Sequence, residues 1–294
     1  MTEAALKLQL YKFNRNIECF RKLGIPYRIV EYSSRAHIYS INKATGEIFR
    51  RFDYVFDTSP VDGIGIVHRT FNNVLSRMES GEYVPKNTDN DRTSIKTSFF
   101  NDSEVMHVQS PIRDVARGDV VAVDINSCYF NTLFQLGAID EAMYRAGFKK
   151  KEAYKLARNV AVGSLNRTGL IREWDGISEY ETTGLERRNT AVVRLDVIDT
   201  VYNRSLKIAK ELGSDFLFFL TDCFFIRPSG LEKLKLLLDK HLYTYKVENI
   251  RLLGAETNQN NTIIRWKSKT NDTAFYNFNN YSQKLSNQVI YSGL

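Results

Sequence analysis

Two apolar runs separated by a short acidic turn constrain the fold of this chain more than any other feature. Residues 216–220 and 223–227 are dominated by Phe, Leu and Ile, so both runs favour β-strands. Only Thr221 and Asp222 separate them, which predicts a hairpin with a carboxylate in its turn. Tight hairpin turns need positive φ and favour Asn-Gly or Asp-Gly, so Thr-Asp breaks a local rule. Such a break indicates a functional site, although a solvated turn residue is the simpler alternative.

A second carboxylate, Asp124, ends the apolar strand predicted over residues 119–125, where an acidic group is costly to bury. With residues 127–189 set aside, the elements predicted from here to residue 253 run strand, helix, strand, strand, helix, strand. This is the order of the split βαβ, or ferredoxin-like, unit. Its first strand lies beside the central hairpin, so we expect Asp124 and Asp222 to meet at one sheet edge. Two carboxylates there would repel each other unless they shared a cation, and oxygen ligands suit Mg²⁺.

The remaining periodicity divides the chain into four segments and predicts an α+β fold. Residues 1–80 are expected to form a small domain of helix, β-hairpin and helix, and 81–118 a linker rich in Asn, Asp, Thr and Ser. Residues 119–255 form the main domain, with an insertion at 137–189, and 256–294 a basic and polar C-terminal segment. The individual helices are expected at 3–23, 64–79, 151–168, 190–212 and 229–241, and the other strands at 28–32, 37–41, 47–52 and 246–253.

Composition narrows the class of partner. The chain has 294 residues with a net charge of +7, which favours an anionic partner such as nucleic acid. Its three cysteines and four histidines are scattered, which argues against zinc chemistry or a Cys–His nucleophile. No apolar run is long enough to cross a bilayer and no signal peptide is evident, so a cytoplasmic protein with free thiols and no membrane partner is expected.

A basic helix face supplies the charge opposite to the carboxylates. Lys151, Lys155 and Asn159 follow one another at i, i+4 and i+8 on the helix expected at 151–168, so they share a face, with Arg158 beside them. Such a row can hold a triphosphate by position and charge. A solvated basic face is the common alternative.

In chain order, these pieces resemble the three polymerase motifs of family B DNA polymerases, with the protein-primed phage branch nearest. Asp124-Ile125-Asn126-Ser127-Cys128-Tyr129-Phe130 resembles the first motif, Asp-x-x-Ser-Leu-Tyr-Pro. The stretch from Lys155 to Gly163 resembles the second, Lys-x-x-x-Asn-Ser-x-Tyr-Gly. Leu220-Thr221-Asp222-Cys223 resembles the third, Asp-Thr-Asp-Ser. The resemblance covers roughly residues 115–255 and implies a polymerase palm, with 137–189 as short helical fingers.

The resemblance also implies roles for individual residues. Asp124 and Asp222, with the carbonyl of Ile125, would hold Mg²⁺, which Mn²⁺ can replace. Tyr129 would stack under the sugar and exclude a 2′-hydroxyl, unless it is simply a core tyrosine. The incoming nucleotide would lie against Ser127 of the first motif and against Lys155, Arg158, Asn159 and Gly163 in the second. Lys151, on the same basic helix face, is a further candidate to bind it.

Two basic groups are candidates for holding nucleic acid. Arg265, Lys267 and Lys269 stand roughly where the family has a Lys-x-Tyr element that grips the primer, but here no tyrosine follows, and an exposed loop is the alternative. On the N-terminal hairpin, Arg50 and Arg51 lie among further basic residues that could contact phosphates. A solvated hairpin explains them equally well.

The sequence therefore predicts a nucleotidyltransferase that extends a primer 3′-end on a DNA template, using deoxynucleoside triphosphates. It suits a viral or mobile-element enzyme in the host cytoplasm, acting with replication or priming proteins. Leu220 replaces the first Asp of the third motif, and no exonuclease pattern precedes Asp124. The rival interpretations are a polymerase-derived module that binds nucleic acid without turnover, and a primase.

Overall fold

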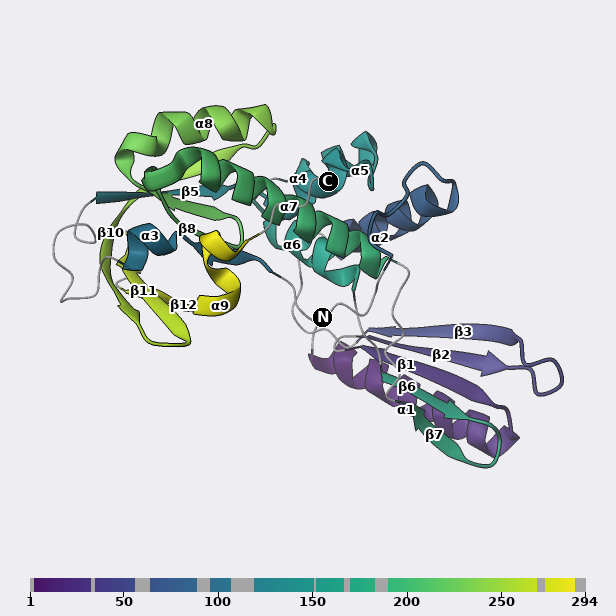
Figure 1. Cartoon of the computed structure of the whole chain (residues 1–294). Helices are drawn as coiled ribbons and strands as arrows, with labels where there is room; N and C mark the ends of the chain where they lie inside the picture. Colours follow the sequence, from purple (N-terminus) through teal and green to yellow (C-terminus); the bar gives the residue numbers. More distant parts are fainter. Residues whose placement is uncertain are drawn as a thin grey trace. The chain divides into compact units, whose positions relative to one another are not determined.

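The computed structural model describes residues 3–32, 35–55, 64–88, 96–106, 119–150, 152–166, 170–182, 190–268 and 273–288. Helices and strands are mixed along the chain, which confirms the α+β class (Figure 1). The chain forms two compact units, Met1–Asn90 with Ile139–Arg194, and Asp91–Ala138 with Leu195–Leu294. This division differs from the predicted one, because the insertion joins the N-terminal segment and the C-terminal segment joins the main domain. The predicted linker, 81–118, is divided between the two units and contains a strand at 98–100 and a helix at 102–106.

A five-stranded antiparallel sheet organises the first unit. Its strand order is β3-β2-β1-β6-β7, and helix α1 (Glu3–Leu23) covers one face (Figure 1). Phe13 of α1 packs with Tyr27, Ile29 and Ile38 in one apolar cluster, because alternate strand residues point to the same face. The strands are β1 (Tyr27–Tyr32), β2 (Arg35–Ile41), β3 (Ile48–Val55), β6 (Leu170–Trp174) and β7 (Glu179–Thr182).

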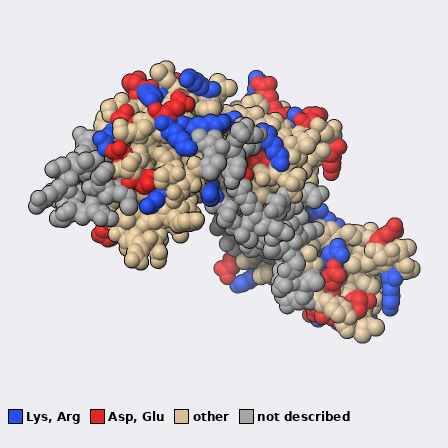
Figure 2. Space-filling view, in the orientation of Figure 1, with Lys and Arg blue, Asp and Glu red and all other residues tan. Residues whose placement is uncertain are grey.

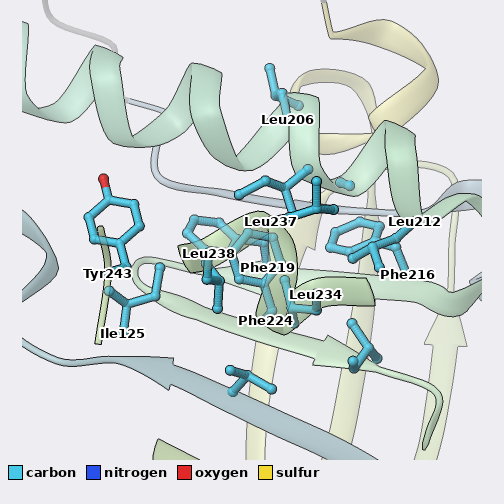
Figure 3. Close-up of a cluster of buried hydrophobic side chains, with 14 of the residues drawn as sticks. Ile125, Leu206, Leu212, Phe216, Phe219, Phe224, Leu234, Leu237, Leu238 and Tyr243 are labelled. Carbon is cyan, nitrogen blue, oxygen red and sulfur yellow. The ribbon is translucent and has the colours of Figure 1, made fainter. Parts of the chain in front are cut away.

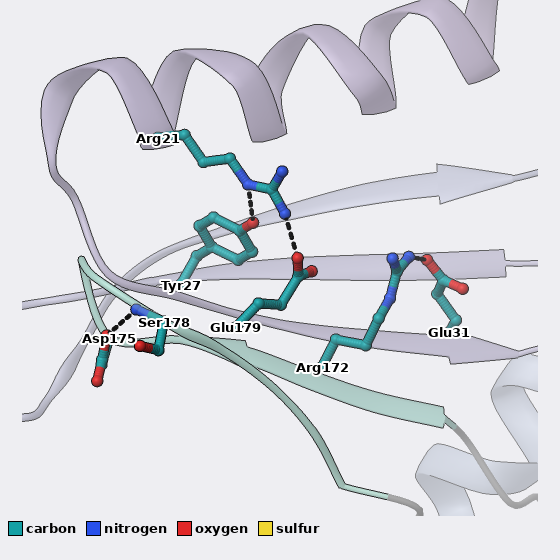
Figure 4. Close-up of polar contacts among 7 residues, drawn as sticks. All are labelled: Arg21, Tyr27, Glu31, Arg172, Asp175, Ser178 and Glu179. Carbon is teal, nitrogen blue, oxygen red and sulfur yellow. Dashed lines mark hydrogen bonds and ion pairs between the residues drawn. The ribbon is translucent and has the colours of Figure 1, made fainter.

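Strands β6 and β7 correct the prediction of a purely helical insertion. The ring of Trp174 stacks on Tyr27 of β1, with centroids 5.5 Å apart. Arg172 pairs with Glu31, and Arg21 of α1 pairs with Glu179 of β7 (Figure 4). These contacts join segments that are distant in sequence, and local periodicity carries no signal for such pairing.

The first unit also contains helices α2 (Ile64–Glu79), α5 (Glu141–Phe148) and α6 (Lys155–Ser164). Asp140 caps α5 by accepting a hydrogen bond of 2.7 Å from the backbone N–H of Met143. Asn73 of α2 donates to the same carboxylate at 2.6 Å and accepts from its backbone N–H at 2.9 Å. These bonds fix α5 to α2.

A seven-stranded antiparallel sheet organises the second unit, in the order β12-β11-β10-β5-β9-β8-β4. The strands are β4 (Ser98–Phe100), β5 (Asp119–Ile125), β8 (Phe216–Leu220), β9 (Cys223–Ile226), β10 (Tyr245–Thr257), β11 (Asn261–Lys267) and β12 (Ala274–Asn279). The helices are α3 (Asp102–Met106), α4 (Cys128–Gln135), α7 (Ala191–Leu212), α8 (Leu231–Lys240) and α9 (Asn280–Gln283). The expected sequence of elements is present as β5, α7, β8, β9, α8 and β10, with β5 between β9 and β10.

Alternation along the strands gives this sheet two buried faces. Val121, Val123 and Ile125 of β5 face α7 and α8, and pack with Leu206 and Leu238 (Figure 3). On the opposite face, Val120 and Ala122 pack in a second cluster with Phe218, Phe225 and Ile264. Because both faces are covered, the strands appear in the sequence as continuous apolar runs.

Strands β11 and β12 were not expected, since residues 256–294 were predicted only as a basic and polar segment. Ile264 and Phe278 nevertheless alternate into the second cluster. The rings of Phe278 in β12 and Phe100 in β4 lie 5.2 Å apart, although these strands are at opposite ends of the strand order. The sheet is therefore curled around the second cluster.

Candidate two-carboxylate site

Backbone pairing brings Asp124 and Asp222 to neighbouring positions. Asp124 on β5 pairs directly with Cys223 on β9, the residue that follows Asp222. The N–H of Ile125 donates a 3.0 Å hydrogen bond to the carbonyl of Asp222. Both acidic residues are half-buried. The end of β5 and the turn of the β8–β9 hairpin thus meet at one edge of the sheet.

The turn that carries Asp222 is strained. Thr221 has φ of 56°, a left-handed conformation that is rare for a β-branched residue. The N–H of Asp222 donates to the carbonyl of Leu220 at 2.5 Å, the bonding pattern of a γ-turn with positive central φ, which is rare and strained. Two bonds to neighbouring elements hold this turn: Thr221 N–H donates to Thr97 O at 2.9 Å, and the Tyr129 hydroxyl donates to Thr221 O at 2.7 Å.

Residues with a left-handed backbone conformation cluster around this edge of the sheet. Among the described residues, the non-glycine positions with positive φ are Ser127, Thr221 and Leu242, at 48°, 56° and 57°. Ser127 precedes α4, and Leu242 leads into β10, whose Tyr245 pairs with Ile125. Three independent segments therefore accept unfavourable φ values around the end of β5. Strain of this kind is typical of functional sites, because the surrounding structure must hold it in place.

A row of side chains crosses five strands beside the carboxylates. Successive pairings run from Ser98 to Leu220, to Cys223, to Asp124 and to Lys246. All five positions alternate onto the face opposite α7 and α8, where Leu220 and Cys223 border the second cluster. The hydroxyl of Ser98 is buried and has no hydrogen-bond partner among the described residues. The row therefore places polar groups at the end of an otherwise apolar face.

The negative charges of Asp124 and Asp222 both raise the pKa of the same two thiols, Cys223 and Cys128. Burial raises the pKa of Cys223, and the negative charges of Asp124 and Asp222 raise it further. The pKa of the fully buried Cys128 is also raised, by burial first and then by Asp222, with a smaller effect of Asp124. Both thiols stay protonated at neutral pH and are free cysteines, as the sequence predicted. The shared effect indicates that the two acidic groups lie in one electrostatic environment.

A partly buried polar network supports the site from the helical side, and sequence reasoning missed it. The Tyr243 hydroxyl lies 2.9 Å from Thr132 Oγ1 on α4, and Arg204 Nη1 on α7 donates to that hydroxyl at 3.1 Å. Arg204 also donates to Gln135, whose amide nitrogen donates to the His241 carbonyl at 2.9 Å. Burial raises the pKa of Tyr243 to about 12. The network ties α4 and α7 to the segment that enters β10.

The residues expected to bind the nucleotide divide between the two units. Ser127 and Tyr129 belong to the second unit with both carboxylates, whereas Lys155, Asn159 and Gly163 are exposed on α6 of the first. Lys151 and Lys269 lie outside the described residues.

The prediction for Arg158 is wrong, because its side chain is buried and does not lie on the exposed face of α6. Its Nη1 donates to the carbonyl of Gly147 at 2.9 Å, and its guanidinium lies 4.3 Å from the ring centroid of Phe148. Burial lowers its pKa. Arg158 therefore joins α6 to α5, and it has no open side from which to grip a triphosphate.

The basic residues expected to hold nucleic acid are in part neutralised. Arg265 and Lys267 lie on β11, not in a loop, and Arg265 pairs with Glu256. Arg51 bonds to Asp53 at 2.6 Å, while Arg50 lies over the ring of Phe52 at 4.9 Å. Figure 2 shows Lys and Arg side chains interspersed with Asp and Glu on the visible face of each unit. Paired arginines of this kind attract a polyanion less than their number suggests.

No family model matches the chain, and a search of curated proteins finds no match. In the described part of the chain, no three or more His, Cys, Asp or Glu side chains are grouped so that they could hold a metal ion. A metal at this edge would therefore depend on two carboxylates and on oxygen atoms of other kinds. None of the helices in the described ranges combines the length and apolar character needed to cross a membrane.

Proposed function

We propose that this chain is a template-directed nucleotidyltransferase that extends a primer 3′-end with deoxynucleotides, its second unit being a polymerase palm. The main support is the meeting of Asp124 and Asp222 at one sheet edge through the pairing of Asp124 with Cys223. The element order β5, α7, β8, β9, α8, β10 supports it, as do the strained residues around the edge. The ligand chemistry, the identity of the substrates and a cytoplasmic, viral or mobile-element setting are parts of this proposal.

The residues present fit a magnesium site. Mg²⁺ is commonly bound by one or two carboxylates, with waters and substrate phosphates as the other ligands. Asp124 and Asp222 would hold it, together with the carbonyl of Ile125, and a third protein carboxylate is not required. When bound, such ions activate a 3′-hydroxyl and stabilise a leaving pyrophosphate. The chain itself positions the two carboxylates. The hydroxyl of Tyr129 holds the turn before Asp222, and the pairing of β5 with β9 fixes the position of Asp124.

A primer-extension assay with Asp124→Asn and Asp222→Asn tests this proposal. We expect each variant to lose incorporation of labelled deoxynucleotides and to weaken Mn²⁺ binding measured by electron paramagnetic resonance. Glu211→Gln is a matched control, since Glu211 is an exposed carboxylate on α7 of the same unit. Circular dichroism establishes that each variant is folded. Full incorporation by either aspartate variant would overturn the proposal.

One observation favours a second function, a module that binds nucleic acid without turnover. Leu220 stands where the family's third motif has its first Asp, and it packs against an apolar cluster instead of adding a charge. This function predicts salt-sensitive binding of primer-template with no incorporation in Mg²⁺ or Mn²⁺. Ribonucleotides in the same assay separate a primase from both.

A further inference from the structure

Lys246 lies beside Asp124 on the same face of the sheet. The two residues are directly paired between β10 and β5, which sets their Cβ atoms about 4.5–5.5 Å apart. Lys246 shares its strand face with Ile250, which is buried in the cluster that holds Val120 and Ala122 of β5. Asp124 shares the face of Val120 and Ala122. The side chains of Lys246 and Asp124 therefore leave the sheet on the same side.

The strand around Lys246 is open along one edge. Strand β11 pairs with β10 only from Arg251 onward, so within the described ranges Tyr245–Ile250 is paired on the β5 side alone. Lys246 itself is exposed. An incoming group can thus approach Lys246 from the open edge of β10 while it contacts Asp124.

We propose that Lys246 binds a phosphate oxygen of the substrate held at Asp124, and this inference rests on the proposed function. An exposed lysine opposite a single carboxylate contributes little to folding, so stability alone gives weak grounds for a cation at this position. A lysine ammonium is a compact charge suited to phosphate, and hydrogen bonds between charged groups are the stronger ones. The phosphate belongs either to a nucleoside triphosphate or to the primer strand.

In this proposal, Lys246 takes the phosphate-binding role that the sequence predicted for Arg158 and Lys155. Arg158 is buried, and Lys155 lies on the other unit. The position of Lys246 relative to Asp124 is instead set by backbone pairing within a single sheet. Sequence reasoning missed this lysine, although counting the expected register of strand 246–253 against 119–125 would have indicated it.

The inference predicts that Lys246→Gln affects metal binding and phosphate binding differently. Removing a positive charge beside Asp124 removes repulsion of a cation, so Mn²⁺ affinity is expected to stay equal or to increase. Phosphate binding is expected to weaken by about tenfold, the scale of one charged hydrogen bond. A purely structural lysine would lower both affinities together.

The experiment measures binding without turnover. Fluorescence anisotropy follows a labelled, non-hydrolysable deoxynucleoside triphosphate in one arm, and a labelled primer-template ending in a dideoxynucleotide in the other, both with Mn²⁺. We expect Lys246→Gln to weaken one arm about tenfold, Lys246→Arg to restore it, and Lys240→Gln, at the exposed end of α8, to change neither. The weakened arm identifies the source of the phosphate.

Two results overturn the inference, and each is distinguishable from failure of the proposed function. Unchanged binding in both arms would show that Lys246 contacts no phosphate. Weakened Mn²⁺ binding with a lowered unfolding midpoint would assign it a structural role. If the native chain binds neither probe, the proposed function itself fails, and the inference fails with it.

Discussion

The hydroxyl of Tyr129 donates a 2.7 Å hydrogen bond to the backbone carbonyl of Thr221. This bond joins the start of α4 to the strained residue before Asp222, while the tyrosine ring packs against the core on the helical side. We expect Tyr129→Phe to cost about 1 kcal/mol of unfolding free energy, the usual value of one hydrogen bond. Urea denaturation measures this. Single-turnover incorporation should slow, because the turn that carries Asp222 loses one of its anchors.

The ring of Tyr129 has a separate test. If it excludes a 2′-hydroxyl, as the family resemblance implies, Tyr129→Val should raise ribonucleotide incorporation relative to deoxynucleotide incorporation, whereas Tyr129→Phe should leave the ratio unchanged. The ratio of the two kcat/KM values is the measurement. Equal discrimination by the native chain and Tyr129→Val would leave Tyr129 with its structural role alone.

Strain at Thr221 predicts an unusual response to glycine. Glycine adopts positive φ without the steric cost that a β-branched residue carries. We therefore expect Thr221→Gly to leave the unfolding free energy unchanged or to raise it by up to about 1 kcal/mol, while Mn²⁺ affinity falls because the turn becomes less fixed. Thr45→Gly, in a loop where φ is not positive, should be destabilising. A clear loss of stability in Thr221→Gly would show that the strain is relieved elsewhere.

Arg158 should behave as a structural residue. Arg158→Met keeps the aliphatic volume but removes the bond to the Gly147 carbonyl, so a loss of about 2 kcal/mol is expected. Lys155→Met, on the exposed face of the same helix, should change stability by no more than about 0.5 kcal/mol. Thermal or urea denaturation of both variants checks the contrast. Equal stability of the two would restore Arg158 as a candidate for ligand binding.

The contribution of Asp140, the N-cap residue of α5, to the stability of the fold should depend on pH. The hydrogen bond from Met143 and the amide of Asn73 lower the pKa of Asp140. A carboxyl with a depressed folded-state pKa stabilises the fold above its ordinary pKa, near 4, and loses this contribution as pH falls through the folded-state value. Asp140→Ala should therefore cost about 1 kcal/mol at pH 7 and distinctly less near pH 3, measured by urea denaturation. Asp140→Asn, which retains a capping oxygen, should cost less at pH 7.

Local patterns predicted local structure well. The helices over residues 3–23 and 64–79 have the predicted bounds, because the apolar spacing that predicts each helix lies within its own segment. Gly24, with positive φ, directly follows the end of the first helix at Leu23. The hairpin around Thr221 and Asp222 was equally evident, since two apolar runs flank it. Its broken turn rule corresponds to a positive φ at Thr221.

The pairing of β5 with β9 followed from the expected order of elements, but the strands that the insertion adds to the first unit could not be predicted in this way. Nothing in residues 170–182 indicates that they complete the N-terminal sheet, since Tyr27 and Trp174 are complementary only once the strands are adjacent. The burial of Arg158 likewise depends on Phe148 and Gly147 of a neighbouring helix. The basic row on α6 looked uniform because helical spacing places Arg158 near the exposed face without showing what covers it.

The central place of β5 has a consequence for biosynthesis. Its two partners, β9 and β10, are translated long after it, so Asp124 emerges from the ribosome with no neighbour to pair with. The first unit, in contrast, has all its strands once β7 has been made. Contacts between residues this distant in sequence form slowly, and apolar strands are prone to aggregate until they are paired. The nascent chain should therefore need chaperone protection chiefly for its second unit, and the two-carboxylate site should be assembled last.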